Sequence, residues 1–420
     1  MKPSALLRAL SATIAFGLWA GAVPVQAQQA PAPAASAPTF AVRAEVGAAL
    51  QQAVELFRGG KVAEAHARIV QAQGATADAQ PAERTVMHRL RGLFALQLEK
   101  LPEAVQELEA AVALGAQAAQ DQLLCMESLA RVHFNLKAYA ASAEWARKAQ
   151  AAGSSSAPVQ AVLVRSAYLQ KDFPGTIKLL EAQEKARGPL AVDDLRILAS
   201  SYGESKDEAN YVRLTERLLR DHGRTEYWGD LLSRVQRVPG WQARWDIDLY
   251  RLRFLLGQME EADDYLVLAD MAARAGQPVE AQKVLQAGFA KGVLGKGSGA
   301  AEHQKFRASV DKQAADDRAS LGSAAARPPS LGDARAAAAT FNTGAALVAV
   351  GQADRGLELM KAALGGPLAD GAQARLQYAQ ALQLAGRTAE AADQFKALAS
   401  QESIGLLARL WQLAASGSRP

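Results

Sequence analysis

Small residues recur in this sequence at a spacing that few folds can use. The segments GKVAEAHARIVQAQ, KLPEAVQELEAAVAL and GRTAEAADQFKALAS each combine a turn, a Glu-Ala pair and an apolar period near 3.6 residues. Twelve residues before the aligned alanine, most units carry Ala or Gly again. The nine pairs are Ala53 and Ala65, Gly92 and Ala104, Ala130 and Ser142, Val164 and Thr176, Ala199 and Tyr211, Leu232 and Arg244, Ala269 and Ala281, Gly344 and Gly356, and Ala379 and Ala391.

The physical meaning of these pairs is a helical hairpin. Two antiparallel helices cross closely only where the contact residues are small. Large apolar residues four positions further on would fill the groove beside each contact. They are Ile69, Leu108, Leu180, Leu285, Met360 and Phe395.

This pattern of small and apolar residues resembles the tetratricopeptide repeat, a helix-turn-helix unit of about 34 residues. The resemblance covers roughly residues 43 to 290 and 334 to 400, and is weakest at Tyr211 and Arg244. It implies an all-α fold, a right-handed superhelical solenoid of tetratricopeptide-like hairpins. Solenoids of this kind present an extended concave binding surface.

The first residues predict export. Lys2 and Arg8 give a positive start, residues 9–23 form an uncharged and largely apolar run, and residues 25–27 fit a small-x-small cleavage pattern. We expect cleavage after Ala27, no membrane span afterwards, and a periplasmic location in a Gram-negative host. Residues 28–40, rich in Ala, Pro and Gln, predict a disordered linker.

Composition excludes several classes of function. Without Lys2 and Arg8 the chain keeps 45 basic and 43 acidic residues, a formal charge of +2, which gives no argument for a nucleic-acid partner. Cys125 is the only cysteine, so no internal disulfide can form, and we expect it to pack as a small apolar group. The five histidines have no metal-ligand spacing, and no phosphate-binding loop or serine elbow occurs. We therefore expect no enzyme, no cofactor and no metal.

The repeats suggest two domains. Residues 41–320 form the N-terminal solenoid, with a further helix over 300–320. Residues 321–333 are rich in helix breakers and predict a linker. Residues 334–420 form C-terminal repeats, and a terminal helix around residues 406–413 would cover the last open face.

The segment YWGDLLSRVQRVPGWQARW interrupts the small-residue pattern. It holds Trp228, Trp241 and Trp245, and Leu232 and Arg244 occupy its small sites. Bulky contacts should push these two helices apart so that rings fill the gap. The alternative is an exposed patch that binds a partner, since Trp and Arg are favoured at binding hot spots. We favour a core position for Trp228 and leave Trp241 as a candidate interface residue.

Several basic and aromatic residues fall on the expected inner face of successive first helices. Arginine can hold a carboxylate with two parallel hydrogen bonds, and a ring three residues away shares its face. The resemblance to peptide-binding tetratricopeptide proteins implies capture of an acidic segment or a chain terminus, although arginine stands where their clamp has asparagine. These candidates are Arg89, Arg131, Phe134, Arg165, Tyr168 and Arg196.

A narrower resemblance covers the middle of the chain. The order of short motifs is similar to that of periplasmic tetratricopeptide proteins described as components of TonB systems, which implies a helper role in envelope transport. The motifs are Tyr227-Trp228 with Leu231, Leu268-Ala269, residues 275–278, Ala281, residues 283–285, Gly288 and residues 292–294.

Three functions remain open from the sequence. The first is a scaffold that binds a protein or peptide partner in the envelope. The second is a structural assembly factor or non-catalytic subunit of outer-membrane, cell-wall or polysaccharide machinery. The third, an enzyme, has no supporting motif. The partner and the oligomeric state are not encoded in any recognisable pattern.

Overall fold

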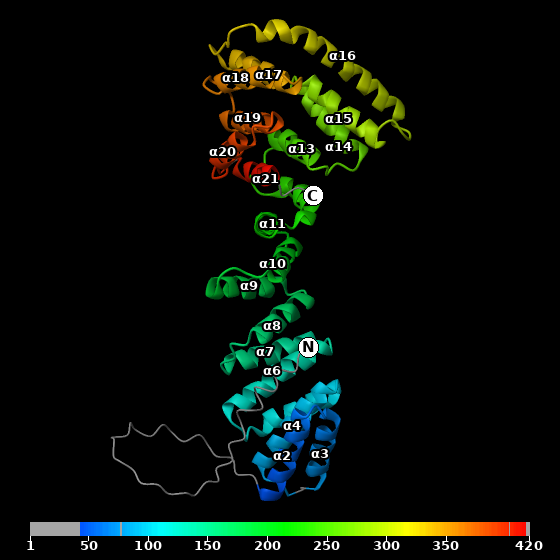
Figure 1. Cartoon of the computed structure of the whole chain (residues 1–420), viewed down its shortest axis with the longest axis vertical. Coiled ribbons are helices and arrows are strands. Elements are labelled where there is room, and N and C mark those ends of the chain that lie inside the picture. Colours follow the sequence, from blue (N-terminus) through cyan, green and yellow to red (C-terminus); the bar gives the residue numbers. More distant parts are fainter. Residues whose placement is uncertain (1–42, 76–77, 403, 417–420) are drawn as a thin grey trace, which may run out of the picture. The chain divides into compact units, whose positions relative to one another are not determined.

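The computed structural model describes residues 43–75, 78–402 and 404–416, and these fold into helices without a strand (Figure 1). The predicted leader and the linker over 28–40 lie outside the described residues. The described chain divides into two compact units, one ending at Ala186 and one starting at Arg187. Among the described helices, none is both long and apolar enough to span a bilayer.

The first unit consists of four consecutive hairpins. In the first three, the two helices pack closely against one another, and each of these hairpins also packs on the first helix of the next. The helices are α2 (Ala44–Arg58), α3 (Val62–Ala75), α4 (Pro81–Gln97), α5 (Leu101–Leu114), α6 (Ala119–Asn135), α7 (Tyr139–Ala151), α8 (Ala157–Leu169) and α9 (Phe173–Arg187).

The second unit contains hairpins at both ends and an irregular segment between them. The regular pairs are α10 with α11, α14 with α15, α17 with α18, and α19 with α20. The helices are α10 (Val192–Glu204), α11 (Glu208–His222), α12 (Trp228–Arg234), α13 (Asp246–Leu255), α14 (Ala262–Arg274), α15 (Pro278–Lys291), α16 (Ala300–Ala325), α17 (Ala334–Ala349), α18 (Ala353–Ala363), α19 (Gly371–Leu384), α20 (Thr388–Leu398) and α21 (Gly405–Ala415).

Two of the predicted hairpins show very close helix contacts at their small residues. A Cβ atom added to Gly344 would lie 2.6 Å from the carbonyl oxygen of Gly356 and 2.7 Å from Cγ of Met360. Similarly, a Cβ on Gly92 would lie 2.7 Å from Cγ of Leu108. The prediction of tetratricopeptide-type hairpins is therefore confirmed at the level of individual contacts.

The turn inside each regular hairpin uses one left-handed residue. It stands five residues before the second small position in eight units, with φ between 59° and 93°. Non-glycine residues pay a steric cost in this conformation, whereas glycine adopts it freely. The eight residues are Gly60, Glu99, Lys137, Lys171, Lys206, Gly276, Gly351 and Gly386.

The tryptophan segment departs from the predicted splayed hairpin. The chain forms the short helix α12 and three single 3₁₀ turns, at residues 225–227, 235–237 and 243–245. Leu232 is buried, but Arg244 lies in a 3₁₀ turn with its side chain half exposed. The two therefore form no helix contact. Large side chains at both small sites prevent the close crossing that a hairpin needs.

The predicted linker at residues 321–333 starts later in the structure. Helix α16 continues to Ala325, and residues 326–333 contain no helix. Because α16 packs against both α15 and α17, this segment joins two parts of the second unit. The boundary between the compact units lies instead between Ala186 and Arg187.

Candidate partner-binding surfaces

Arg131 on α6 is a half-buried cation that forms no ion pair at salt-bridge distance among the described residues. Burial lowers the pKa of its guanidinium, and Glu127, one turn earlier, offsets this effect only in part. Arginine remains protonated at any physiological pH, so the loss of hydration is not relieved by deprotonation. An incoming carboxylate would therefore stabilise this group more than it would a solvated arginine.

Arg165 occupies the equivalent position on α8, thirty-four residues later. It is exposed, and no ion pair engages it in the described chain. Helices α6 and α8 pack against each other, so two available guanidinium groups lie on neighbouring first helices of the first unit. These two residues are called the basic face below; that it binds a partner stays a prediction.

The two predicted aromatic residues are engaged mainly in the hairpin turns. Phe134 lies against Tyr139 with ring centroids 5.5 Å apart, and Tyr168 lies edge-on to Phe173 at 5.9 Å. Both pairs join the end of a first helix to the start of the second. These ring contacts stabilise the two turns. All four rings also remain partly exposed to solvent.

Arg89 does not join this basic face. It is buried, forms an ion pair with Asp121 at the start of α6, and donates a hydrogen bond to Gln117. The sequence places Arg89 in register with Arg131 but does not reveal that the next hairpin supplies an acid. Its charge therefore links successive repeats and is not available to a ligand.

Arg196 and Trp241 belong to the second unit. Arg196 is exposed on α10, and its Nε donates a 2.8 Å hydrogen bond to the Tyr227 hydroxyl. Trp241 is half-buried, stands edge-on to Trp245 at 5.4 Å, and donates a 2.8 Å hydrogen bond from Nε1 to Asp246. Trp228 is fully buried, as expected. The tryptophan segment thus has two buried rings, Trp228 and Trp245, and one half-exposed outer ring, Trp241.

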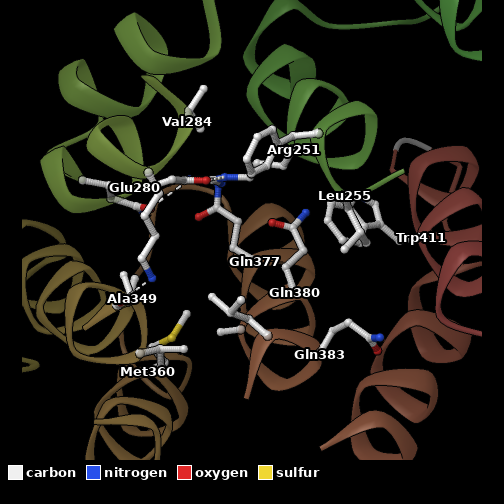
Figure 2. Close-up of a pocket in the computed structure, with 17 residues that line it drawn as sticks. Arg251, Leu255, Glu280, Val284, Ala349, Met360, Gln377, Gln380, Gln383 and Trp411 are labelled. Atoms are coloured by element: carbon white, nitrogen blue, oxygen red, sulfur yellow. Dashed lines mark hydrogen bonds and ion pairs between the residues drawn. The ribbon is translucent and has the colours of Figure 1, made fainter. Parts of the chain in front are cut away.

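A cavity of about 550 Å³ opens in the second unit, a feature that sequence reasoning missed (Figure 2). Helices α13, α15, α17, α18, α19 and α21 supply its walls. Most of the lining is apolar and includes Phe254, Val284, Val348, Met360 and Trp411.

Glutamines of α19 bring polar groups to this cavity. Gln373, Gln377, Gln380 and Gln383 follow one another at helical spacing, which places them along one face. Gln373 lies outside the cavity and bonds to Asp248 on α13, while the other three line its wall. Figure 2 shows Gln377 and Gln380 extending from α19 toward Arg251. This spacing was the sequence signal that could have drawn attention to the site.

Asp248 forms hydrogen bonds with residues from several helices that line the cavity. This fully buried carboxylate accepts hydrogen bonds from Arg251 at 2.9 Å and from Gln373 at 2.9 Å, and its backbone carbonyl accepts one from Trp411 Nε1 at 3.1 Å. Arg251 in turn pairs with Glu280 of α15 at 2.7 Å. One buried acid therefore connects α13 with α15, α19 and α21.

The terminal helix α21 packs on α20 of the last repeat. Trp411 stacks on Phe395 of α20 with centroids 6.0 Å apart. The same helix reaches beyond the last repeat, since Arg409 pairs with Glu216 of α11 at 2.9 Å. Its role is therefore wider than capping one hairpin.

Two kinds of reactive site can be assessed in the described ranges, metal-binding clusters and the Cys125 thiol. No group of three or more His, Cys, Asp or Glu side chains there is placed to hold a metal ion. Cys125 is buried, as expected, and burial raises the pKa of its thiol to about 11, so it remains protonated at neutral pH.

No family model and no curated protein sequence matches the chain. Solved structures resemble it in fold. The structure of Naa15/Naa10 bound to HypK-THB has a TM-score of 0.41 and 12% identity, over 85% of this chain and 63% of that one. The chain thus spans less than two thirds of that protein's length.

Two further structures are of similar kind. A tetratricopeptide repeat protein from Parabacteroides merdae ATCC 43184 has a TM-score of 0.34 and 11% identity, over 81% of this chain and 98% of that one. The P58(IPK) TPR domain has a TM-score of 0.24 and 12% identity, over 89% of this chain and 98% of that one. At these values the likeness concerns helical-repeat architecture and says nothing of partners.

Proposed function

We propose that this protein is an exported, non-catalytic scaffold that binds an acidic segment or chain terminus of a protein partner in the cell envelope. The observation that carries the proposal is Arg131, a partly desolvated guanidinium that forms no ion pair at salt-bridge distance in the described chain and is only partly compensated by Glu127. Arg165 adds a second available cation on the neighbouring first helix. Two guanidinium groups on a rigid face suit a ligand that carries carboxylates.

The envelope location rests on the leader-like first residues. A positive start, an apolar run and a small-residue cleavage pattern are typical of a secretory signal. The similarity to tetratricopeptide components of TonB systems, carried by the motifs between Tyr227 and Leu294, supports a helper role in TonB-type transport. N-terminal sequencing of the envelope fraction should start at Gln28, and an intact Met1 would contradict export.

The competing function is a structural assembly factor or non-catalytic subunit of outer-membrane or cell-wall machinery. Such a protein would bind a folded complex over a broad surface and would not depend on two arginines. The test must therefore ask whether the basic face decides which partner is bound.

Site-specific photocrosslinking in the periplasm provides this test. We would place p-benzoylphenylalanine at Leu169, which is exposed and lies one helical turn after Arg165 on the same face. Arg131→Ala with Arg165→Ala should abolish the crosslinked partner band without lowering the melting temperature. The matched control, Arg84→Ala with Arg147→Ala, removes the same charge from exposed positions of the same unit and should keep the band.

The outcomes separate the candidates. Loss of the band only in the first double variant supports the scaffold. Retention of every partner in both variants would overturn the role of the basic face and favour the assembly factor.

A further inference from the structure

We propose that the cavity in the second unit binds a short polypeptide segment in which a large apolar residue stands next to a carboxylate. The site lies among α13, α15, α17 and α19 and shares no residue with the basic face of the first unit. It therefore goes beyond the scaffold function and can be tested apart from it.

The size and walls of the cavity suit an apolar side chain. A volume of about 550 Å³ falls within the range of sites that bind small ligands or short segments. Trp411 and Phe254 contribute aromatic surface, and Val348 and Met360 contribute aliphatic surface. Burial of a large side chain against this lining would remove apolar area from water on both sides.

The glutamines distinguish a peptide from a simple hydrocarbon. Gln373 and Gln377 direct their carboxamides to Asp248, at 2.9 and 3.5 Å. By contrast, Nε2 of Gln380 is buried and has no hydrogen-bond partner among the described residues. Oε1 of Gln383, further along the same wall, is in the same situation.

A buried amide without a partner costs free energy, and an alkyl chain in the cavity would keep that cost in place. A polypeptide offers a carbonyl and an N–H group at every residue, next to its side chain. It can therefore satisfy the Gln380 carboxamide and fill the apolar space at once. A fatty-acid carboxylate could accept from Gln380 but has no donor for Oε1 of Gln383, so the two amides together favour a peptide over a fatty acid.

The charges on the lining favour an anion beside the apolar residue. Arg251 already pairs with two carboxylates, Glu280 and Asp248, and is not available to an anion, which leaves Lys283 as the cation that could bind one. Lys283, on the exposed side of α15, donates a hydrogen bond to the Ala349 carbonyl but pairs with no carboxylate in the described chain. A carboxylate from an acidic side chain or from a chain terminus could form an ion pair with the Lys283 ammonium group.

Fluorescence anisotropy with labelled peptides on the full mature chain tests the site. The probes are Gly-Ser-Gly-Leu-Asp-Gly-Ser with an amidated end, the same peptide with Asn for Asp, the same with Gly for Leu, and Gly-Ser-Gly-Gly-Leu with a free carboxylate. We expect saturable binding of the Leu-Asp probe and about tenfold weaker binding of the Asn and Gly versions. The last probe distinguishes a terminal carboxylate from a side-chain one.

Three variants locate the binding. Ala345→Phe should fill the cavity and remove binding, whereas Asn342→Phe, on the exposed side of the same helix, should not. Lys283→Gln should make the Asp and Asn probes equivalent, whereas Lys305→Gln, on α16 outside the cavity, should leave them distinct. Gln380→Leu should weaken peptide binding without lowering the melting temperature, because it removes a buried amide that has no partner.

Several results would overturn the proposal. These are no saturable binding of any carboxylate-bearing probe, binding that survives Ala345→Phe, or displacement of the peptide by decanoate as readily as by unlabelled peptide. None of them would affect the crosslink at the Arg131 and Arg165 face, so failure here and failure of the scaffold function are distinguishable.

Discussion

The hairpin of α17 and α18 and the tryptophan segment around α12 differ in what fills the space between successive helices. In the hairpin, Gly344 and Gly356 bring two backbones so close that neither position has room for a Cβ atom. In the tryptophan segment, Leu232 and Arg244 stand at the equivalent positions, the helices shorten, and the buried rings of Trp228 and Trp245 fill the interior.

The difference shows that a close hairpin needs small residues in the contact between its helices. The pair α10 and α11 keeps a regular hairpin with Tyr211 at one small position, because Gly203 on the facing helix leaves room for the ring. In the tryptophan segment both positions carry large side chains, and the local structure becomes irregular. The regular regions should therefore be sensitive to added atoms, and the irregular segment to removed ones.

Trp228→Ala should give the largest effect. The ring is fully buried, and its removal leaves a cavity in a segment with little regular structure to support it. We expect a loss of about 3–5 kcal/mol in the free energy of unfolding, measured by chemical denaturation. A loss below that of Trp241→Ala would contradict the assignment of Trp228 as the core ring.

Gly356→Ala tests whether a regular hairpin is destabilised by an added methyl group. The new Cβ would lie 2.5 Å from the carbonyl oxygen of Gly344, so the helices must separate. Overpacking of this kind costs about 1–3 kcal/mol. As control, Gly322→Ala on α16 has no neighbour within 4 Å and should raise stability by about 0.5–1 kcal/mol. Equal effects at both glycines would show that close contact is not what position 356 requires.

Trp241→Ala should have a smaller effect on stability than either change. The half-exposed ring loses one edge-on contact and the hydrogen bond to Asp246, which together are worth about 0.5–1.5 kcal/mol. A photocrosslinker at this position in a folded protein would then reveal any partner of the outer ring. A cost near that of Trp228→Ala would instead place Trp241 in the core.

Lys171→Gly addresses the left-handed turn between α8 and α9. Lys171 has φ of 61°, where glycine is free of steric cost. We expect a gain of about 0.5–1 kcal/mol after the extra chain entropy of glycine is considered. Gly351→Ala, at the equivalent turn with φ of 93°, should do the reverse. Thermal unfolding of the pair decides whether the left-handed turn is a general requirement of the repeat.

Acid should loosen the first regular hairpins by a modest amount. Arg43 holds the pKa of the Glu83 carboxyl at about 2, below its ordinary value of 4.5. Its stabilising contribution is therefore complete above pH 4.5 and is lost as the pH falls toward 2. The stability difference between wild type and Glu83→Gln should shrink over this range, whereas Glu55→Gln, at an exposed acid, should show no such trend.

The parts of the fold that could be predicted from sequence are those set by neighbours along the chain. The contact of Gly92 with Leu108 and the burial of Trp228 depend on spacing within one repeat. The pairing of Arg89 with Asp121 could not be predicted, because charge on a helix face does not disclose what the next hairpin brings. The cavity was missed for the same reason, although the glutamine spacing on α19 was visible.

The bonds of Asp248 have a consequence for the order in which the protein folds. Its partners Gln373 and Trp411 lie 125 and 163 residues further along the chain. Hairpins of the first unit need only local contacts and can form one after another as the chain emerges, since repeat arrays propagate between neighbours. Asp248 gains all of these partners, Gln373 at its carboxylate and Trp411 at its backbone carbonyl, only when the last helix has been synthesised. Because distant contacts slow folding, the second unit should reach its native state last.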